Sequence, residues 1–91
     1  MRFIWDPNKA AINIQRHRVS FEEAMEAFFD QNAVDDYDIE HSDDESRFNL
    51  IGLSSRRLLF VVYTEPEEGT IHIISARRAE GKQQRIYEEQ S

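Results

Sequence analysis

The spacing of hydrophobic residues changes along the chain, and the change predicts helices first and strands afterwards. Between Phe21 and Phe29 the apolar residues recur at helical spacing, with Phe21, Ala24, Met25 and Phe28 expected to be buried. The segments 33–39, loosely, and 47–53 show the two-residue alternation of strands. The solid apolar run from Leu58 to Tyr63 is typical of a central strand covered on both faces.

Two short polar motifs predict where the first two helices begin. Asp6 precedes Pro7, and an Asp cap followed by proline at the first helical position predicts a helix that runs to His17. Ser20 and Glu23 have the spacing of a capping box, in which each side chain bonds the backbone of the other residue. We therefore expect one helix over residues 7–17 and a second over residues 21–29.

The remaining segments complete an α+β prediction. Residues 2–5 predict a short strand, residues 65–69 a turn, and residues 70–75 an antiparallel hairpin partner for the central strand. Ser75 is expected to cap a final helix over residues 76–89, which Gly81 would weaken. The predicted fold is an antiparallel β-sheet meander with two N-terminal helices and one C-terminal helix, in a single domain of residues 1–91.

Composition excludes several classes of protein. The 91 residues, 40% of them hydrophobic, suffice for one core. No run approaches the roughly 18 apolar residues that span a bilayer, and the first twenty residues carry charges where a signal peptide needs an apolar stretch. The absence of cysteine excludes disulfides, thiolate zinc sites and a cysteine nucleophile. We therefore expect a cytoplasmic protein with no membrane association and no cofactor.

The formal net charge of −7 argues against a nucleic-acid partner, but the charge is unevenly distributed. Residues 30–45 hold eight carboxylates and no Lys or Arg, which leaves the rest of the chain close to neutral. The acidic stretch, including Asp35, Asp36, Asp43 and Asp44, lacks the glycine that a calcium loop requires. We interpret it as a solvated loop and strand edge whose charges prevent unwanted pairing, and we predict no metal site.

Positive charge is concentrated around the predicted final helix. Arg78, Lys82 and Arg85 would share one helical face, with Arg77 beside them in the first turn. A helix N-terminus attracts anions through its free amides, and arginine binds phosphate with paired N–H groups. This pattern predicts a phosphate site at residues 75–78. The alternative is a solvated face whose cations pair with neighbouring glutamates.

Several motifs together resemble the BrnT toxin family. They are Phe3 to Ala10, Asn13 with His17, Val19 to Ala24, Arg47 and Phe48 with Gly52, Val61 to Thr64, and Ile73 to Ala79. The resemblance extends over nearly the whole chain and implies a RelE-like fold and a ribonuclease activity that blocks translation. It also implies inhibition by a cognate antitoxin, BrnA, in a complex that binds DNA and regulates its own synthesis. Many relatives have a glycine where this chain has Arg18.

Metal-independent RNA cleavage requires a base for the 2′-hydroxyl proton, cations for the pentacoordinate phosphate and an acid for the leaving oxygen. Arginine stays protonated, so Arg77 and Arg78 would stabilise the phosphate. A histidine has an ordinary pKa near ~6.5, which makes His17 the best candidate for moving protons. The other candidates for this role are Tyr63, Tyr87, Lys9 and Glu80.

Further cations are predicted to hold RNA, namely Lys9, Arg47, Arg57, Lys82 and Arg85. Lys9 lies eight residues before His17, so the two would line one groove of the first helix, about 12 Å apart. Tyr63 is expected either to stack on a base or to lie at the rim of the core.

A second function class stays open at this stage. A non-enzymatic module could bind a partner protein and help it repress transcription from DNA. Direct DNA binding by this chain is disfavoured, because neither of the first two helices has a dense basic face. We therefore expect DNA contacts only indirectly, through the antitoxin.

Overall fold

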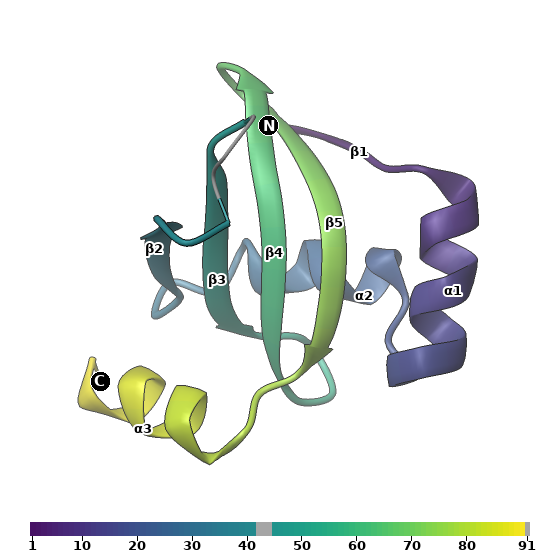
Figure 1. Cartoon of the computed structure of the whole chain (residues 1–91). Helices are drawn as coiled ribbons and strands as arrows, with labels where there is room; N and C mark the ends of the chain where they lie inside the picture. The colour runs from purple at the N-terminus through teal and green to yellow at the C-terminus, as the bar shows by residue number, and fades with distance from the viewer. Residues whose placement is uncertain (42–44, 91) are drawn as a thin grey trace.

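In the residues that the structure describes, five strands form one sheet with helices on both of its sides (Figure 1). The computed structural model describes residues 1–41 and 45–90. The elements in chain order are β1 (Arg2–Ile4), α1 (Pro7–His17), α2 (Phe21–Ala27), β2 (Val34–Asp38), β3 (Arg47–Leu53), β4 (Leu58–Glu67), β5 (Thr70–Arg78) and α3 (Gly81–Glu89).

The strand order is β1-β5-β4-β3-β2, and the sheet is mixed. Strands β2 to β5 form the predicted antiparallel meander. Strand β1 instead joins β5 in parallel, so the prediction of a purely antiparallel meander is wrong. The ring of Phe3 on β1 also packs edge-on against the ring of Phe28, with 5.2 Å between the ring centres. No tight turn links β1 to its partner, so the sequence around it carries no signal of its direction.

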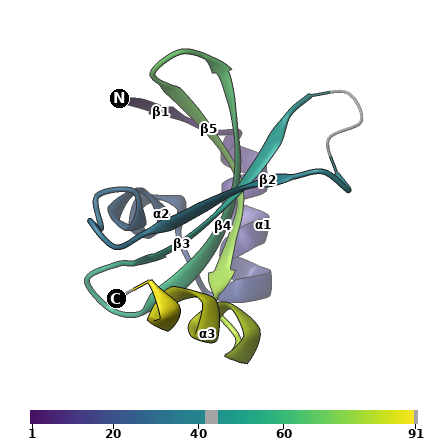
Figure 2. The same ribbon diagram turned by 90° about the vertical axis from the view of Figure 1, so that its left-hand side faces the viewer.

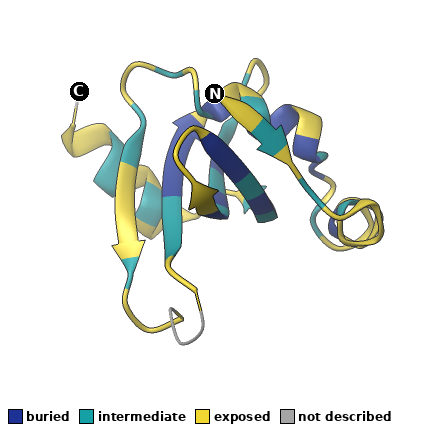
Figure 3. Ribbon diagram, turned by 90° about the horizontal axis from the view of Figure 1, so that it is seen from above, coloured by how far each residue is buried: buried dark blue, intermediate teal, exposed yellow. Residues whose placement is uncertain are grey.

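The core lies between the sheet and α2. Phe21, Ala24 and Ala27 of α2 are fully buried, and they meet the fully buried Leu59 and Val61 of β4. Figure 3 shows the buried residues gathered in the central strands and in α2. The helix approaches the sheet closely at Gly52, where an added Cβ would lie 2.5 Å from the backbone oxygen of Ala27.

The opposite side of the sheet is only partly covered, and we call it the open face. Paired residues of neighbouring antiparallel strands present their side chains on the same face, so Phe60 and its partner Arg77 lie together. Helix α3 covers one end of the open face, in front of the sheet in Figure 1, while α2 lies behind it, and Figure 2 shows the two helices on opposite sides of the strands. Strand β4 is central, as predicted, but Phe60 and Val62 on the open face are only half-buried.

The boundary between β5 and α3 differs from the prediction. Strand β5 continues to Arg78, because Arg77 and Arg78 pair with Phe60 and Leu59 and the backbone N–H of Ala79 bonds the oxygen of Leu58. Helix α3 begins only at Gly81, and the Gln83 side chain accepts a hydrogen bond from the Glu80 backbone at 2.8 Å. Ser75 is therefore a strand residue and not a helix cap.

The first two helices begin where the sequence predicts. The Asp6 side chain accepts from the backbone N–H of Asn8, and Ser20 accepts from that of Glu23. The second helix ends at Ala27 and not at Phe29. The other half of the predicted capping box is wrong, because the Glu23 carboxylate bonds Arg57 and Ser54.

Strand β4 is longer than predicted and runs through most of the expected turn. It ends at Glu67, and Glu67 pairs with Thr70 across a two-residue turn in which Gly69 has a φ of 85°. Pro66 is accommodated because the register shifts between Thr64 and Glu67, where a ladder hydrogen bond is not required.

The acidic stretch forms an edge of the sheet, as predicted. Strand β2 is the last strand in the order, and Asp35 and Asp36 are exposed on it. The expectation for Asp43 and Asp44 lies outside the described residues.

Candidate active site at the end of strand β5

Arg77 lies on the open face at the end of β5. Its guanidinium carbon lies 4.7 Å from the centre of the Phe60 ring, in a cation–π contact. Its Nη1 donates to Glu80 Oε1 at 2.8 Å. One third of the side chain remains exposed, so the guanidinium is held by two partners and still faces solvent.

Helix α1 is fastened beside β5 by the buried side chain of Asn13. The Asn13 amide nitrogen donates to the backbone oxygens of Val19 at 2.9 Å and Ala76 at 2.8 Å. Its amide oxygen accepts from the backbone N–H of Ala76 at 3.2 Å. These bonds set the position of α1 relative to Arg77, which follows Ala76 directly.

The last turn of α1 brings His17 to the same place. The helix ends at Arg18, which has a φ of 59° and bonds the Ile14 oxygen through its backbone N–H. This φ lies in the left-handed region, which favours glycine. His17, just before this residue, is half-buried and lines a hollow next to β5.

Three surface hollows meet around the end of β5. We call the first the His17 hollow; it has a volume of about 350 Å³ and is lined by Arg16, His17, Arg77, Arg78 and Glu80. The Lys9 hollow shares His17 with the His17 hollow. It extends along α1 to Lys9 and is bounded on the β5 side by Ser75. The Arg47 hollow shares Arg77 with the His17 hollow and extends over the open face to Arg47 and Asn49.

The structure thus brings together six residues that the sequence nominated, namely Lys9, His17, Arg47, Arg77, Arg78 and Glu80. They come from α1, β3, β5 and the start of α3, and they lie along one continuous surface. Within residues 1–41 and 45–90, the side chains of His17 and Arg78 make no hydrogen bond or ion pair, so both remain available to a ligand. Such a site can surround an anion with guanidinium groups and place an imidazole beside it.

Comparison with known proteins decides the family. Residues 5–83 match a family described as the ribonuclease toxin, BrnT, of type II toxin–antitoxin systems. The chain belongs to the BrnT family. Its structure is similar to the crystal structure of the Brucella abortus ribonuclease toxin BrnT, with a TM-score of 0.61 over 88% of this chain and 97% of that one. The two sequences are 23% identical, so this similarity shows a shared fold. No curated protein gave a significant match.

The two tyrosines nominated for catalysis lie elsewhere in this BrnT-family fold. Tyr63 is 5% exposed, and its hydroxyl donates to both carboxylate oxygens of Asp35 at 2.7 Å. Burial and the Asp35 carboxylate strongly raise the pKa of Tyr63. The Tyr87 hydroxyl donates to Asp30 Oδ2 at 2.6 Å, and that bond raises its pKa. Neither tyrosine lines the three hollows.

Arg57, nominated for phosphate binding, is occupied by protein groups. Its Nε and Nη2 donate to the two carboxylate oxygens of Glu23 at 3.0 and 2.8 Å, and Nη2 also donates to the backbone oxygen of Arg18 at 2.7 Å. The pairing holds the pKa of Glu23 below its ordinary value. Arg57 therefore connects α2 to the residue that ends α1, which supports the turn carrying His17.

The cations of α3 do not form the predicted stripe. Arg78 belongs to β5, so it does not share a helical face with Lys82 and Arg85. Lys82 lines a separate hollow between α3 and the sheet, and Arg85 is exposed. We predicted that the dipole of the final helix would act at Arg77 and Arg78. The helix begins only at Gly81, so this prediction is wrong.

Two kinds of feature are absent from residues 1–41 and 45–90. No three His, Asp or Glu side chains in these ranges are grouped as a metal site would require. No helix there is both long and apolar enough to span a bilayer.

Two residues that build the site could not be recognised from local sequence patterns. Asn13 was part of the family resemblance, but its bonds to β5 join residues 63 positions apart. Phe60 lay inside an apolar run that indicates only a strand, although its ring supports Arg77.

Proposed function

We propose that this BrnT-family chain is a toxin that cleaves RNA without a metal ion, at the His17 hollow. The observation that carries the proposal is the convergence of His17, Arg77, Arg78 and Glu80 in one hollow, from an α1 terminus and the β5–α3 junction. This set offers both the cations and the proton-moving groups that the reaction requires.

The two arginines hold the scissile phosphate in this scheme. Arg78 has no side-chain partner among the described residues, and Arg77 is oriented by Phe60 and Glu80. Guanidinium groups beside the phosphate stabilise the negative charge that develops on its oxygens in the transition state. Because arginine does not release its proton, both groups act electrostatically.

Glu80 and His17 move the protons. Glu80 is paired with Arg77 and therefore acts as a carboxylate, which accepts the proton of the 2′-hydroxyl. The freed oxygen attacks phosphorus, the bond from phosphorus to the 5′ oxygen breaks, and the protonated imidazole of His17 supplies a proton to that oxygen. The products are a 2′,3′-cyclic phosphate and a 5′-hydroxyl end.

The RNA lies along the surface formed by the Lys9 and Arg47 hollows. Lys9 on one side and Arg47 on the other are placed to meet the phosphates that flank the scissile one. Tyr63, Tyr87 and Arg57 support the fold and do not act on RNA, because their polar groups are engaged by Asp35, Asp30 and Glu23.

The toxin acts in the cytoplasm, where cleavage of RNA blocks translation. A BrnA-type antitoxin neutralises it, and any DNA is bound through that antitoxin. Expression alone should arrest growth, and co-expression of the antitoxin should restore it. Growth that is unaffected by the folded toxin would favour the alternative, a non-catalytic module that binds a partner protein.

An RNA-cleavage assay in EDTA tests the activity, with RNA free in solution and on ribosomes. We expect cleavage by the wild-type chain and a fall of about 100- to 1,000-fold in the Arg77→Ala, Arg78→Ala double variant. His17→Ala should fall by about 100-fold or more. The matched control is the Arg2→Ala, Arg56→Ala double variant, which also removes two cations but at exposed positions outside the hollows.

Intact RNA in the presence of folded wild-type toxin, in both settings, would contradict the activity. Cleavage that appears only after Mg²⁺ is added would contradict metal independence. Equal losses in the two double variants would show that net charge, and not the site at Arg77 and Arg78, controls the rate.

A further inference from the structure

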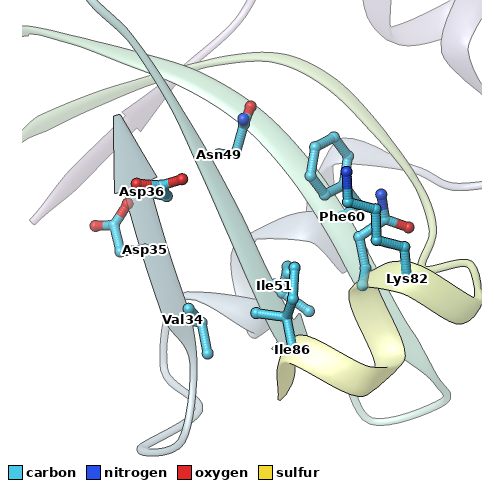
Figure 4. A pocket seen from close by; sticks show the side chains of 9 residues that line it. Val34, Asp35, Asp36, Asn49, Ile51, Phe60, Lys82 and Ile86 are labelled. Carbon is cyan, nitrogen blue, oxygen red and sulfur yellow. The ribbon is translucent and has the colours of Figure 1, made fainter. Parts of the chain in front are cut away.

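A fourth hollow lies between α3 and the open face and has no role in the scheme above. Its volume is about 360 Å³, which is within the range of small-ligand pockets. Figure 4 shows side chains of β2, β3 and β4 on one side and of α3 on the other. Ile51 and Ile86 supply apolar walls, and the polar lining includes Asp36, Asn49 and Lys82.

Three polar groups around this hollow lack partners. The side chains of Asp36 and Lys82 make no hydrogen bond or ion pair within residues 1–41 and 45–90. The Asn49 amide oxygen is buried and accepts no hydrogen bond. A buried acceptor without a donor carries a desolvation cost, which a ligand that brings an N–H group would remove. The terminal torsion of Asn is soft enough for the amide to turn toward such a donor.

The hollow is contiguous with the proposed cleavage site. Phe60 and Asn49 line both this hollow and the Arg47 hollow, and Arg77 lies over the Phe60 ring. Asn49 is on β3, two strands from Arg77, which corresponds to about 10 Å across the sheet. A nucleotide with its phosphate at Arg77 could therefore place its base in the hollow beside Phe60, where aromatic rings favour stacking.

The charges in the hollow distinguish between the bases. A carboxylate presents two acceptor oxygens, and guanine presents two adjacent donors, N1–H and the N2 amino group, on its Watson–Crick edge. A lysine ammonium is a donor, and it matches the O6 and N7 acceptors of guanine. Adenine, cytosine and uracil each lack the pair of adjacent donors. Asp36 on β2 and Lys82 on α3, on opposite sides of the hollow, thus complement guanine.

We propose that the hollow lined by Asp36, Asn49, Phe60 and Lys82 binds a guanine next to the scissile phosphate and so sets the sequence preference of cleavage. The inference rests on the proposed ribonuclease function. It assigns Lys82 to base recognition and not to general phosphate binding.

The test maps cleavage positions in an RNA of mixed sequence and then measures short oligonucleotides that differ at one base. We expect cleavage next to guanosine to be at least about tenfold faster than next to the other three bases. Inosine lacks the N2 amino group, so replacing guanosine by inosine should lower the rate by about tenfold if Asp36 reads that group.

The Asp36→Asn variant should lose the preference for guanosine over inosine, because an amide offers one acceptor where the carboxylate offers two. The matched control is Glu68→Gln, which removes one negative charge at the exposed β4–β5 turn and should keep the preference. Lys82→Met, which removes the donor, should cleave guanosine and 7-deazaguanosine sites equally, whereas the wild-type chain should prefer guanosine.

The outcomes separate this inference from the function on which it rests. Cleavage at equal rates next to all four bases would overturn the guanine pocket and leave the ribonuclease activity standing. A guanosine preference that persists in folded Asp36→Asn would also overturn the pocket. If the wild-type chain cleaves no RNA, both proposals fail together.

Discussion

The side-chain amide of Asn13 bonds both backbone groups of Ala76, at 2.8 and 3.2 Å, across 63 residues of sequence. A single side chain therefore holds the middle of α1 against β5. These bonds set where His17 lies relative to Arg77, because His17 lies one turn farther along α1 and Arg77 follows Ala76.

Asn13→Ala should destabilise the fold by about 2–3 kcal/mol, because backbone groups of Val19 and Ala76 would be left buried without partners. Urea unfolding at pH 7 measures the change. Asn8→Ala, at an exposed position of the same helix, is the control and should change stability by less than about 0.5 kcal/mol. Similar midpoints for the two variants would contradict the role given to Asn13.

Glu23 should make stability depend on pH. The hydrogen bond from Arg57 lowers its pKa in the folded state, so the unfolded chain binds more protons as the pH falls. The stabilisation is complete above the ordinary glutamate pKa of about 4.5 and is lost as the pH falls through the lower folded-state value. Urea unfolding between pH 6 and pH 3 should therefore show a shallower loss for Glu23→Gln than for the wild-type chain.

The exposed neighbour Glu22 provides the control for that experiment. Glu22→Gln changes the same kind of group on the same helix, and its pH profile should follow the wild-type profile. At pH 7, Glu23→Gln should also lower stability by about 1–3 kcal/mol, since it weakens the charged hydrogen bonds to Arg57. Parallel profiles for Glu23→Gln and the wild type would show that the pair contributes no pH dependence.

Gly52→Ala should destabilise the protein by about 1–3 kcal/mol, because the new methyl group would lie 2.5 Å from the Ala27 oxygen and force α2 away from β3. Gly81→Ala is the matched control, since nothing lies within 4 Å of the added carbon and the residue opens α3. Thermal unfolding of both variants should show a lower midpoint only for Gly52→Ala. A Gly52→Ala protein as stable as Gly81→Ala would mean that α2 and β3 are not in close contact.

Tyr87→Phe should leave RNA cleavage within about twofold of wild type and lower stability by about 1 kcal/mol, since it removes only the bond to Asp30. Tyr63→Phe should behave in the same way, because its hydroxyl donates to Asp35 and its raised pKa keeps it protonated. Cleavage rates and urea midpoints are measured on the same preparations. A folded variant whose cleavage rate falls a hundredfold would show that its tyrosine takes part in catalysis.

Much of the secondary structure could be predicted, because its signals are local. The Asp6–Pro7 and Ser20 caps act within three residues of themselves, and both helices begin where these motifs predict. The hairpin of β4 and β5 follows from two apolar segments joined by a turn with Gly69. The family could also be inferred from motifs spread along the chain, and the match over residues 5–83 confirms it.

Residues 75–78 show where local signals stop being sufficient. A serine followed by helix-compatible residues reads as a helix start, yet the backbone of Arg77 and Arg78 pairs with β4. Ladder hydrogen bonds to a neighbouring strand outweighed a capping preference worth about 1 kcal/mol. The cationic residues were identified correctly as neighbours in the chain, but their surroundings changed from a helix terminus to the end of a strand.

The sequence by itself determined which residue types were available, the starts of the first two helices and the separation of acidic from basic segments. Tertiary structure decided the direction of β1, the end of β5, the partners of Tyr63, Tyr87 and Arg57, and the meeting of His17 with Arg77. The reason is physical: caps and turns depend on neighbours in the chain. Sheet pairing and the satisfaction of buried polar groups such as Asn13 depend instead on residues that only folding brings together.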